Sequence, residues 1–425
     1  MYITRVELEN VRCFESLELD FGKPWSSALI VGDNGDGKST LLRSIAIGLC
    51  DESSASALHR ELFGNLVRRG KKTATIRVWL SGALGKGYLI ETTIDSLKAF
   101  ERVTQKVFEY VRGRGKIKKH QENFPWDQIF VTAYGAGIRT IGAEDYEDYL
   151  AVDAVYPLFK YSVFLQNPEL VVRRFVDHDG DRAQGGLRKR EEARQGRLKE
   201  IKLLLARILN LDGPNKVHLT RTGLEIDGPW GRGRVGALGD GYNATITWTL
   251  DLLSWWFLYP SGKRKSAIKP AGIVLIDEVE QHLHPRWQIT IMNSLCKQFP
   301  ELQVIATTHS PLVMSGSGEI PIHRLRDGRH DTLSTMGWRA EDIYRIVMGL
   351  RSSSRSASVD TRIDEYRRLY LRILEKKATQ SEKAKFRRLK RSFQNHLPEG
   401  DSALLTAEMK GLREFLRPRD RKVYK

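Results

Sequence analysis

The first part of the chain has the sequence pattern of β-structure. Apolar and polar residues alternate through residues 3–12 and 17–21, as they do in strands with one buried face. Further strands are predicted at residues 73–80 and 87–94, joined by a glycine-rich turn. The basic segment 111–120 is interrupted by glycine, so we expect a surface loop or a hairpin tip there.

Mostly apolar runs predict a second kind of strand. Residues 28–31, 129–135, 272–276 and 303–307 are short segments of this type, typical of strands that are buried on both faces. A helix is predicted at residues 285–298, between the last two strands. Buried strands that alternate with helices indicate a parallel sheet in an α/β layer architecture.

The middle and the end of the chain are predicted to be mainly helical. Residues 140–213 combine helix-forming residues with strongly mixed charge, and we interpret them as a helical insertion. A hairpin at 217–226 and a glycine-rich loop at 228–241 follow, and then a long apolar helix at 242–259. The serine-rich joint 352–358 precedes a basic, helix-like tail.

Composition places the chain among ordinary globular proteins. Hydrophobic residues make up 41% of its 425 residues and charged residues 28%, which excludes wholesale disorder. No apolar stretch approaches the roughly 20 residues that span a bilayer, and the N-terminus has no signal-peptide pattern. We therefore expect a cytoplasmic protein without membrane contact. Cys13, Cys50 and Cys296 are scattered, which indicates neither a disulfide framework nor a zinc site.

The net charge of +17 is the unusual feature of the composition. A strongly basic surface attracts nucleic acid or another acidic partner. Residues 339–425 contain 23 Lys and Arg against 12 Asp and Glu, so most of the excess lies in the tail. A solvated helical face rich in arginine explains such a tail equally well. Charge alone therefore does not identify the partner.

A phosphate-binding motif lies between the apolar run 28–31 and a predicted helix. Its sequence, GDNGDGKS, matches the P-loop pattern G-x-x-x-x-G-K-[ST]. In such a loop, backbone amides and the helix N-terminus surround the phosphates. Lys38 would bridge the outer phosphates and Ser39 would hold magnesium. The predicted nucleotide-binding residues are Gly32, Asn34, Gly35, Asp36, Gly37, Lys38, Ser39 and Thr40.

Two further motifs stand at the ends of buried strands. Asp277 and Glu278 follow residues 272–276. Beside a P-loop, such a pair is suited to bind magnesium through water and to orient the attacking water. His309 follows strand 303–307, where its ring could reach the γ-phosphate. Alone, neither motif is specific, because buried strands often end in polar surface residues.

Leu238, Gly239, Asp240 and Gly241 form a glycine loop that opens the long apolar helix. A helix N-terminus offers a second anion site, although a bare glycine loop would be only a turn.

The remaining candidates have simpler explanations. His282 and His284, with His323 or His330, could suggest a metal site, but no carboxylate cluster with ligand spacing accompanies them. Trp248, Trp255, Trp256 and Phe257 are expected to pack the long helix rather than stack on bases.

Taken in order, these motifs resemble the ATPase heads of the ABC class, with P-loop, signature loop, Walker B strand, D-loop and switch histidine. The resemblance covers residues 1–336. The strand pair around residues 10–14, the split head and the run 277–285 are similar to the branch that contains RecF, the SMC proteins and the OLD-family ATPases. The implied fold is an α/β P-loop NTPase: a mixed sheet core with an N-terminal β-subdomain, a helical lobe insertion and a helical C-terminal extension.

The resemblance also implies ATP and Mg²⁺ as cofactors and a site shared by two copies of the chain. Asp277 and Ser39 would bind the metal, and Leu238 to Gly241 of one copy would complete the site of the other. Residues 282–285 would be the D-loop. Arg12 would touch the nucleotide or the opposite subunit, unless it is an ordinary exposed arginine at a strand end. Family signatures commonly have serine where this chain has Gly239, so backbone amides would have to replace a hydroxyl contact.

Two features distinguish the chain from other members of this branch. The helical insertion is short compared with the coiled coils of SMC proteins, and no TOPRIM-type glutamate and D-x-D pair follows His309. The chain resembles the compact ATPases of bacterial anti-phage systems such as the Septu type, which work with a separate nuclease. The implied function is ATP hydrolysis by the sensor or regulatory ATPase of such a complex, with DNA as a further partner. A RecF- or SMC-like repair ATPase and a slowly hydrolysing, nucleotide-controlled assembly scaffold are the alternatives.

Four segments are predicted. Residues 1–139 form the first half of the ATPase head, with the β-subdomain and the P-loop. Residues 140–213 form the helical lobe insertion, and residues 214–337 the second half of the head. Residues 338–425 form a basic helical extension.

Overall fold

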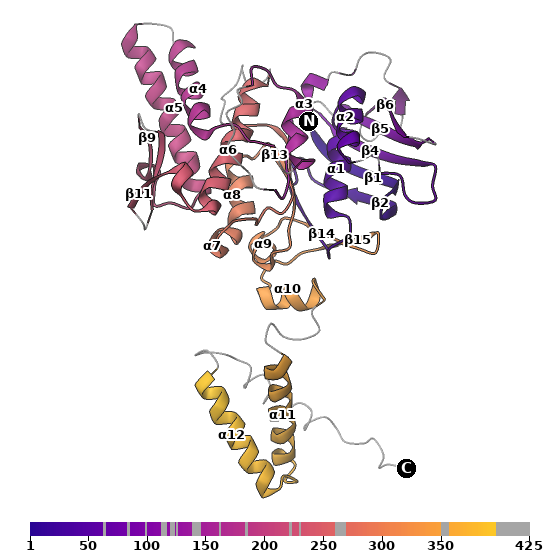
Figure 1. The fold of residues 1–425 in the computed structure, drawn as a ribbon, viewed down its shortest axis with the longest axis vertical. Helices are drawn as coiled ribbons and strands as arrows, with labels where there is room; N and C mark the ends of the chain where they lie inside the picture. Colours follow the sequence, from indigo (N-terminus) through magenta and orange to yellow (C-terminus); the bar gives the residue numbers. More distant parts are fainter. Residues whose placement is uncertain are drawn as a thin grey trace. The chain divides into compact units, whose positions relative to one another are not determined.

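The computed structural model divides the chain into two compact units (Figure 1). The first comprises Met1–Ile343 and the second Tyr344–Lys425; each is described by itself. No helix in the described parts of these units is long and apolar enough to cross a bilayer. The described residues are 1–62, 65–82, 86–97, 100–111, 117–119, 124, 126–137, 146–160, 163–182, 186–220, 223–228, 231–259, 269–349 and 357–396.

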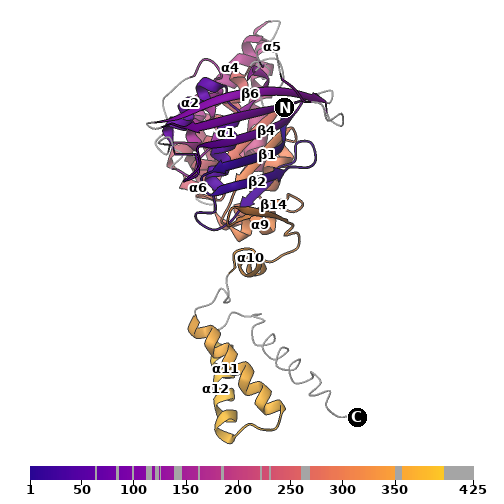
Figure 2. The ribbon, with the colours of Figure 1, turned by 90° about the vertical axis from the view of Figure 1, so that its right-hand side faces the viewer.

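The first unit begins with an antiparallel sheet in the order β2-β1-β4-β5-β6-β7. Figure 2 shows several of its strands side by side. The four strands predicted in this region are confirmed, but β6 was not predicted. Of the described β6 residues only Val103 is buried, so its apolar pattern is weak. The strands are β1 (Tyr2–Val11), β2 (Phe14–Asp20), β4 (Thr73–Ser81), β5 (Lys86–Ser96), β6 (Glu101–Val111) and β7 (Ile117–Lys119).

A second, mixed sheet has the order β15-β14-β3-β13-β12-β8. The strands from β14 to β8 pair in parallel, and β15 pairs antiparallel with β14. Every residue of β3, β8, β12 and β13 is buried, as their apolar composition predicted. The hairpin β14–β15 was not predicted, because His, Arg and Asp interrupt its apolar positions. The strands are β3 (Ala28–Val31), β8 (Val131–Tyr134), β12 (Gly272–Ile276), β13 (Leu302–Thr307), β14 (Ile322–Arg326) and β15 (Arg329–Leu333).

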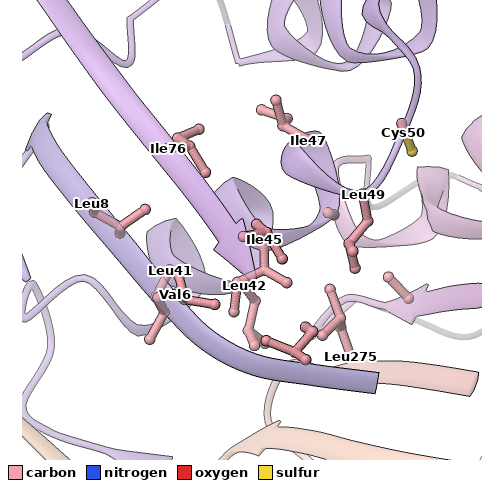
Figure 3. Close-up of a cluster of buried hydrophobic side chains, with 14 of the residues drawn as sticks. Val6, Leu8, Leu41, Leu42, Ile45, Ile47, Leu49, Cys50, Ile76 and Leu275 are labelled. Carbon is pink, nitrogen blue, oxygen red and sulfur yellow. The ribbon is translucent and has the colours of Figure 1, made fainter. Parts of the chain in front are cut away.

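The helix that follows the P-loop, α1 (Lys38–Gly48), contacts strands of both sheets. Its apolar side chains share one buried cluster with Val6 and Ile76 of the N-terminal sheet and Leu275 of the central sheet (Figure 3). The P-loop leads directly into this helix. The hydrophobic core therefore fixes where the phosphate-binding residues lie. The α1 side chains of this cluster include Leu41, Leu42, Ile45 and Ile47.

A lobe of helices and a small sheet lies beside the central sheet (Figure 1). In this lobe α4 packs against both α5 and α6. The small sheet has the order β11-β10-β9, so the loop predicted at 228–241 is wrong in part. Its strand β11 has the sequence GRGR, which carries no apolar alternation. The elements are α4 (Pro168–Arg182), α5 (Leu187–Ile208), β9 (Val217–Thr220), β10 (Gly223–Gly228), β11 (Gly231–Arg234) and α6 (Asp240–Leu258). The short helix α3 (Ala151–Val155) instead contacts β8 and α2.

The long apolar helix and the helical insertion were predicted correctly in outline. In α6, Trp248, Trp255 and Trp256 are buried, which confirms their expected packing role. The helix predicted at 285–298 is instead two helices. Its break at Ile289 lies where the carbonyl of that residue contacts Gly316. The other helices of this unit include α2 (Glu52–Glu61), α7 (Pro285–Gln288), α8 (Ile291–Gln298), α9 (Pro311–Gly316) and α10 (Ala340–Ile346), which continues past the unit boundary.

The described core of the second unit is a helical hairpin of α11 (Ala357–Leu374) and α12 (Gln380–His396). Its small core consists of Tyr366, Leu369, Leu389 and Phe393. The helical character predicted for the tail is confirmed over these residues; the rest of the tail lies outside the described part of the chain.

Candidate nucleotide site

The P-loop connects β3 to α1 and holds its lysine in a defined position. Lys38 is only 7% exposed. Its Nζ donates hydrogen bonds to the carbonyl oxygens of Gly32 and Asp33, both at 2.9 Å. Burial lowers the pKa of Lys38, and the carboxylates of Asp36, Asp277, Asp33 and Glu278 oppose that shift. The ammonium group is thus held inside a ring of acceptors and acids.

Backbone geometry explains the glycines of the loop. Gly37 has a φ of 95° and Gly35 a φ of 97°, in the left-handed region that favours glycine. A Cβ on Gly37 would also overlap with the side chains of Cys13 and Phe14. A Cβ on Gly32 would lie 2.7 Å from the carbonyl oxygen of Leu325. The loop therefore packs directly against the β1–β2 turn and β14.

The polar residues of the loop differ in their surroundings. Asn34 and Gly35 are exposed, whereas Ser39 and Thr40 are half-buried at the start of α1. Asp36 has a local role, because its Oδ2 accepts a hydrogen bond of 2.6 Å from the backbone N–H of Asp33. The nucleotide contacts of these residues remain predictions.

The acidic pair at the end of β12 is fixed by a residue that the sequence did not single out. Thr307, the last residue of β13, donates its hydroxyl to Asp277 Oδ1 at 2.5 Å. The same Oγ1 accepts the backbone N–H of Glu278 at 2.8 Å. Glu278 has a φ of 49°, a strained conformation that persists where surrounding contacts enforce it. Thr307 thus orients both acids.

The predicted catalytic groups lie close enough to influence one another's charge. Burial raises the pKa of Glu278, and the negative charges of Asp277 and Glu280 add to that shift. His309 and Lys38 act in the opposite direction. Since β3, β13 and β12 are neighbours in the sheet, the P-loop, the acids and the histidine meet at the carboxyl ends of parallel strands.

The donors predicted to hold a metal suit Mg²⁺. Ser39 offers a hydroxyl oxygen and Asp277 a carboxylate that is 4% exposed, and oxygen donors are the ligands that Mg²⁺ prefers. Within the described residues there is no cluster of three or more His, Cys, Asp or Glu that could hold a metal by itself. Mg²⁺ in nucleotide sites usually takes one or two protein ligands together with phosphate and water, which agrees with this arrangement. His284 instead accepts the N–H of Arg286 as the N-cap of α7.

The signature loop contacts the D-loop of the same chain. Gly239 is the N-cap of α6, and Gly241 lies against the carbonyl group of His282. The rings of Tyr242 and Trp287 meet edge to face, with their centroids 4.1 Å apart. The start of α6 therefore packs against the D-loop through Gly241 and against α7 through Tyr242.

Arg12 lies in the β1–β2 turn that contacts the P-loop. Its φ is 46°, and its Nε donates to the carbonyl oxygen of Asn65 at 2.7 Å. Burial and the nearby charge of Arg43 lower its pKa. The Arg12 side chain is thus hydrogen-bonded to the segment that precedes β4, and a nucleotide or partner contact by Arg12 remains a prediction.

The packing of the signature loop gives a matched pair of predictions. Gly241→Ala would force a Cβ into the carbonyl of His282, and we expect it to lower the free energy of unfolding by about 1–3 kcal/mol. Gly239→Ala has open space around its Cβ, so we expect a change within about 0.5 kcal/mol. Denaturant unfolding of both variants measures the difference. Equal stabilities would contradict the described contact.

A buried polar network joins α6 to the strand beside the acidic pair. Asp251 Oδ2 accepts the hydroxyl of Tyr134 at 2.9 Å, and its Oδ1 accepts the backbone N–H of Gln166 at 3.0 Å. The carbonyl oxygen of Tyr134 in turn accepts the N–H of Asp277 at 2.8 Å. The helix that begins with the signature loop is thereby linked to the Walker B strand end. Burial raises the pKa of Asp251 to about 6 despite these hydrogen bonds.

Asp251 should make stability depend on pH. The pKa of Asp251 is higher in the folded than in the unfolded chain. The stabilisation from its protonated carboxyl is therefore complete at low pH and is lost as the pH rises through about 6. Relative to Asp251→Asn, we expect the wild type to lose about 1.5 kcal/mol of unfolding free energy between pH 5 and pH 8. Asp227→Asn is the control, because hydrogen bonds from Arg232 and His218 lower the pKa of this half-buried carboxyl to about 2. A constant difference between wild type and Asp251→Asn would contradict the prediction.

Comparison with known proteins agrees with the motifs. An AAA-domain model matches residues 5–209, and an AAA-domain model that carries the labels AbiEii toxin and Type IV TA system matches residues 249–315. Septu protein PtuA of Bacillus mycoides is 23% identical over 330 residues, 76% of this chain and 40% of that protein. The Retron Ec83 probable ATPase of Escherichia coli is 25% identical over 401 residues, 77% of this chain and 72% of that protein. The SMC head domain from Thermotoga maritima has a TM-score of 0.43 at 12% identity and covers 79% of this chain and 100% of its own.

The topology and the motifs are those of a P-loop α/β fold, and together with the sequence relatives they support an ATPase head of the ABC class. The chain is similar to the Septu protein PtuA and, over shorter stretches, to SMC and RecF proteins. It spans about 40% of the length of that Septu relative.

Proposed function

We propose that this chain is an ATP hydrolase that works as a nucleotide-controlled switch. The observation that carries the proposal is the convergence of Lys38, Asp277, Glu278 and His309 at the carboxyl ends of adjacent parallel strands. Phosphoryl transfer depends mainly on positioning and on charge stabilisation. This cluster supplies both.

Each side chain has a proposed task. Lys38 neutralises the outer phosphates, and Glu278 orients the attacking water and polarises it. The His309 ring senses the γ-phosphate. Mg²⁺, held by Ser39 and Asp277, would offset the charge that develops on the phosphate oxygens.

We further propose that a second copy of the chain completes each site. Leu238 to Gly241 would supply backbone amides and a helix N-terminus to the γ-phosphate bound by the opposite copy. The D-loop, which packs against this signature loop in the same chain, would lie at the same interface. ATP would close such a dimer, and hydrolysis would open it.

Mixing two inactive variants tests the shared site. Lys38→Ala disables the P-loop, and Gly239→Glu places a negative charge where the opposite γ-phosphate would bind, at a position with open space around the Cβ. We expect each variant alone to hydrolyse little ATP. Mixed dimers contain one site with an intact P-loop and an intact signature, so the mixture should regain activity. A mixture as inactive as its components would overturn the two-copy site.

For the biological role, we propose the sensor or regulatory ATPase of a bacterial anti-phage complex that acts with a separate nuclease. The similarity to the Septu and retron proteins supports this role. A repair ATPase of the RecF or SMC kind and an assembly scaffold are the competing roles. Cells carrying the chain and its neighbouring genes should resist phage, and Lys38→Ala should abolish resistance. Strong stimulation of ATP turnover by DNA ends would favour repair, and ATP-independent assembly would favour the scaffold.

The exposed face of α12 supports DNA as a further partner. Arg387, Arg388 and Arg391 are exposed on this helix, and arginine clusters bind phosphate groups. We expect the affinity for duplex DNA to fall as the salt concentration rises. In the variant with all three arginines changed to Glu, the affinity should be lower and should depend less steeply on salt. Affinity that stays constant with salt, or that survives the triple change, would argue against this contact.

A further inference from the structure

The turn that follows β12 is connected to the segment that follows β13 by several hydrogen bonds. Thr307 contacts Asp277 and Glu278, as described above, and its carbonyl oxygen also accepts the N–H of Val279 at 3.0 Å. These contacts orient the acids. They do not reach His309, which lies two residues further along.

A different side chain holds the backbone of the histidine. The N–H of His309 donates to Glu280 Oε1 at 2.5 Å. Glu280 is half-buried, and its second oxygen, Oε2, is buried without a hydrogen-bond partner among the described residues. The hydrogen bond to a charged carboxylate is of the stronger kind. Among the described residues, the hydrogen bond that the Glu280 carboxylate accepts therefore comes from the backbone N–H of His309.

We propose that Glu280 is a positioning residue for ATP hydrolysis, which sets the His309 ring through the backbone N–H of that histidine. The inference rests on the proposed ATPase function. The orientation of the peptide determines where the side chain leaves the backbone. A shift of about 1 Å in a group that contacts the reacting phosphate is enough to cost roughly 100-fold in rate.

A purely structural role for Glu280 would be to hold the D-loop, but another connection does that independently. Ser310 Oγ donates to Gln288 Oε1 at 2.7 Å, and Gln288 Nε2 donates to the carbonyl oxygen of Leu283 at 2.9 Å. This second connection joins the same two segments without contacting His309. Gln288→Ala is therefore a matched control for Glu280→Ala.

The test compares steady-state ATP hydrolysis in six variants of the full chain, including His309→Ala alone. We expect Glu280→Ala and the bulkier Glu280→Leu to lower kcat about 10- to 100-fold with little change in KM for ATP. Glu280→Gln should recover most of the activity, because its amide oxygen can accept the same hydrogen bond. In a His309→Ala background, Glu280→Ala should cost nothing further. Gln288→Ala should retain kcat within a few-fold, and thermal unfolding checks that every variant folds.

Three results would overturn the inference: additive losses in the double variant, an equal loss in Gln288→Ala, or no rescue by Glu280→Gln. The bulkier leucine variant keeps the test valid if the alanine variant does not fold. A wild-type chain that hydrolyses no ATP would overturn the proposed function. An active wild type in which Glu280→Ala turns over at the normal rate would overturn only the role of Glu280.

Discussion

Glu278→Gln should lower ATP turnover by roughly 100-fold or more, the scale of a lost general base, while ATP still binds. Glu278 lies at the end of β12, and burial together with the charges of Asp277 and Glu280 raises its pKa. A carboxylate with a raised pKa is a better proton acceptor for the attacking water. Glutamine keeps the size of the side chain but cannot take the proton.

Phosphate release measures this effect, and binding of labelled ATP shows that the site remains intact. The control is Glu319→Gln, which removes one negative charge from an exposed position of the same unit. If Glu278→Gln hydrolysed ATP at the wild-type rate, another group would have to orient the water. A parallel loss of ATP binding would mean that Glu278 holds the nucleotide rather than the water.

The sequence predicts those elements whose burial pattern is either uniform or regularly alternating. Strands β3, β12 and β13 are buried at every residue, and such apolar runs are visible without any partner strand. Strands β6 and β14 are mixed, because their faces are covered unevenly by distant parts of the chain. Their sequences look like loops until the neighbouring strands are in place.

The same distinction holds in the site. Lys38, Asp277, Glu278 and His309 belong to motifs with fixed spacing, so their meeting could be predicted from chain order. Thr307 and Glu280 are common residue types without a motif of their own. Their roles follow from hydrogen bonds across about 30 positions of sequence, Thr307 to Asp277 and Glu280 to His309. Only the pairing of β12 with β13 brings those positions together.

Lys38→Ala should lower the affinity for ATP by about 100-fold or more, since truncating one member of a hydrogen-bonded charge pair costs about 2–5 kcal/mol. Lys38 Nζ is the cation that the two loop carbonyls of Gly32 and Asp33 hold in the loop. Without it, the phosphates would face the carboxylates of the site with one less opposing charge. Titration with a fluorescent ATP analogue measures the affinity.

The loss of affinity should not come from unfolding. Burial lowers the pKa of Lys38, so its charge is held in the folded loop against a desolvation cost. Removing that charge should therefore leave the thermal midpoint unchanged or slightly higher. Lys72→Ala, at an exposed lysine of the N-terminal sheet region, should bind ATP normally. Lys38 is the one lysine or arginine among residues 32–40. A Lys38→Ala variant that binds ATP with wild-type affinity would therefore show that the phosphates bind elsewhere.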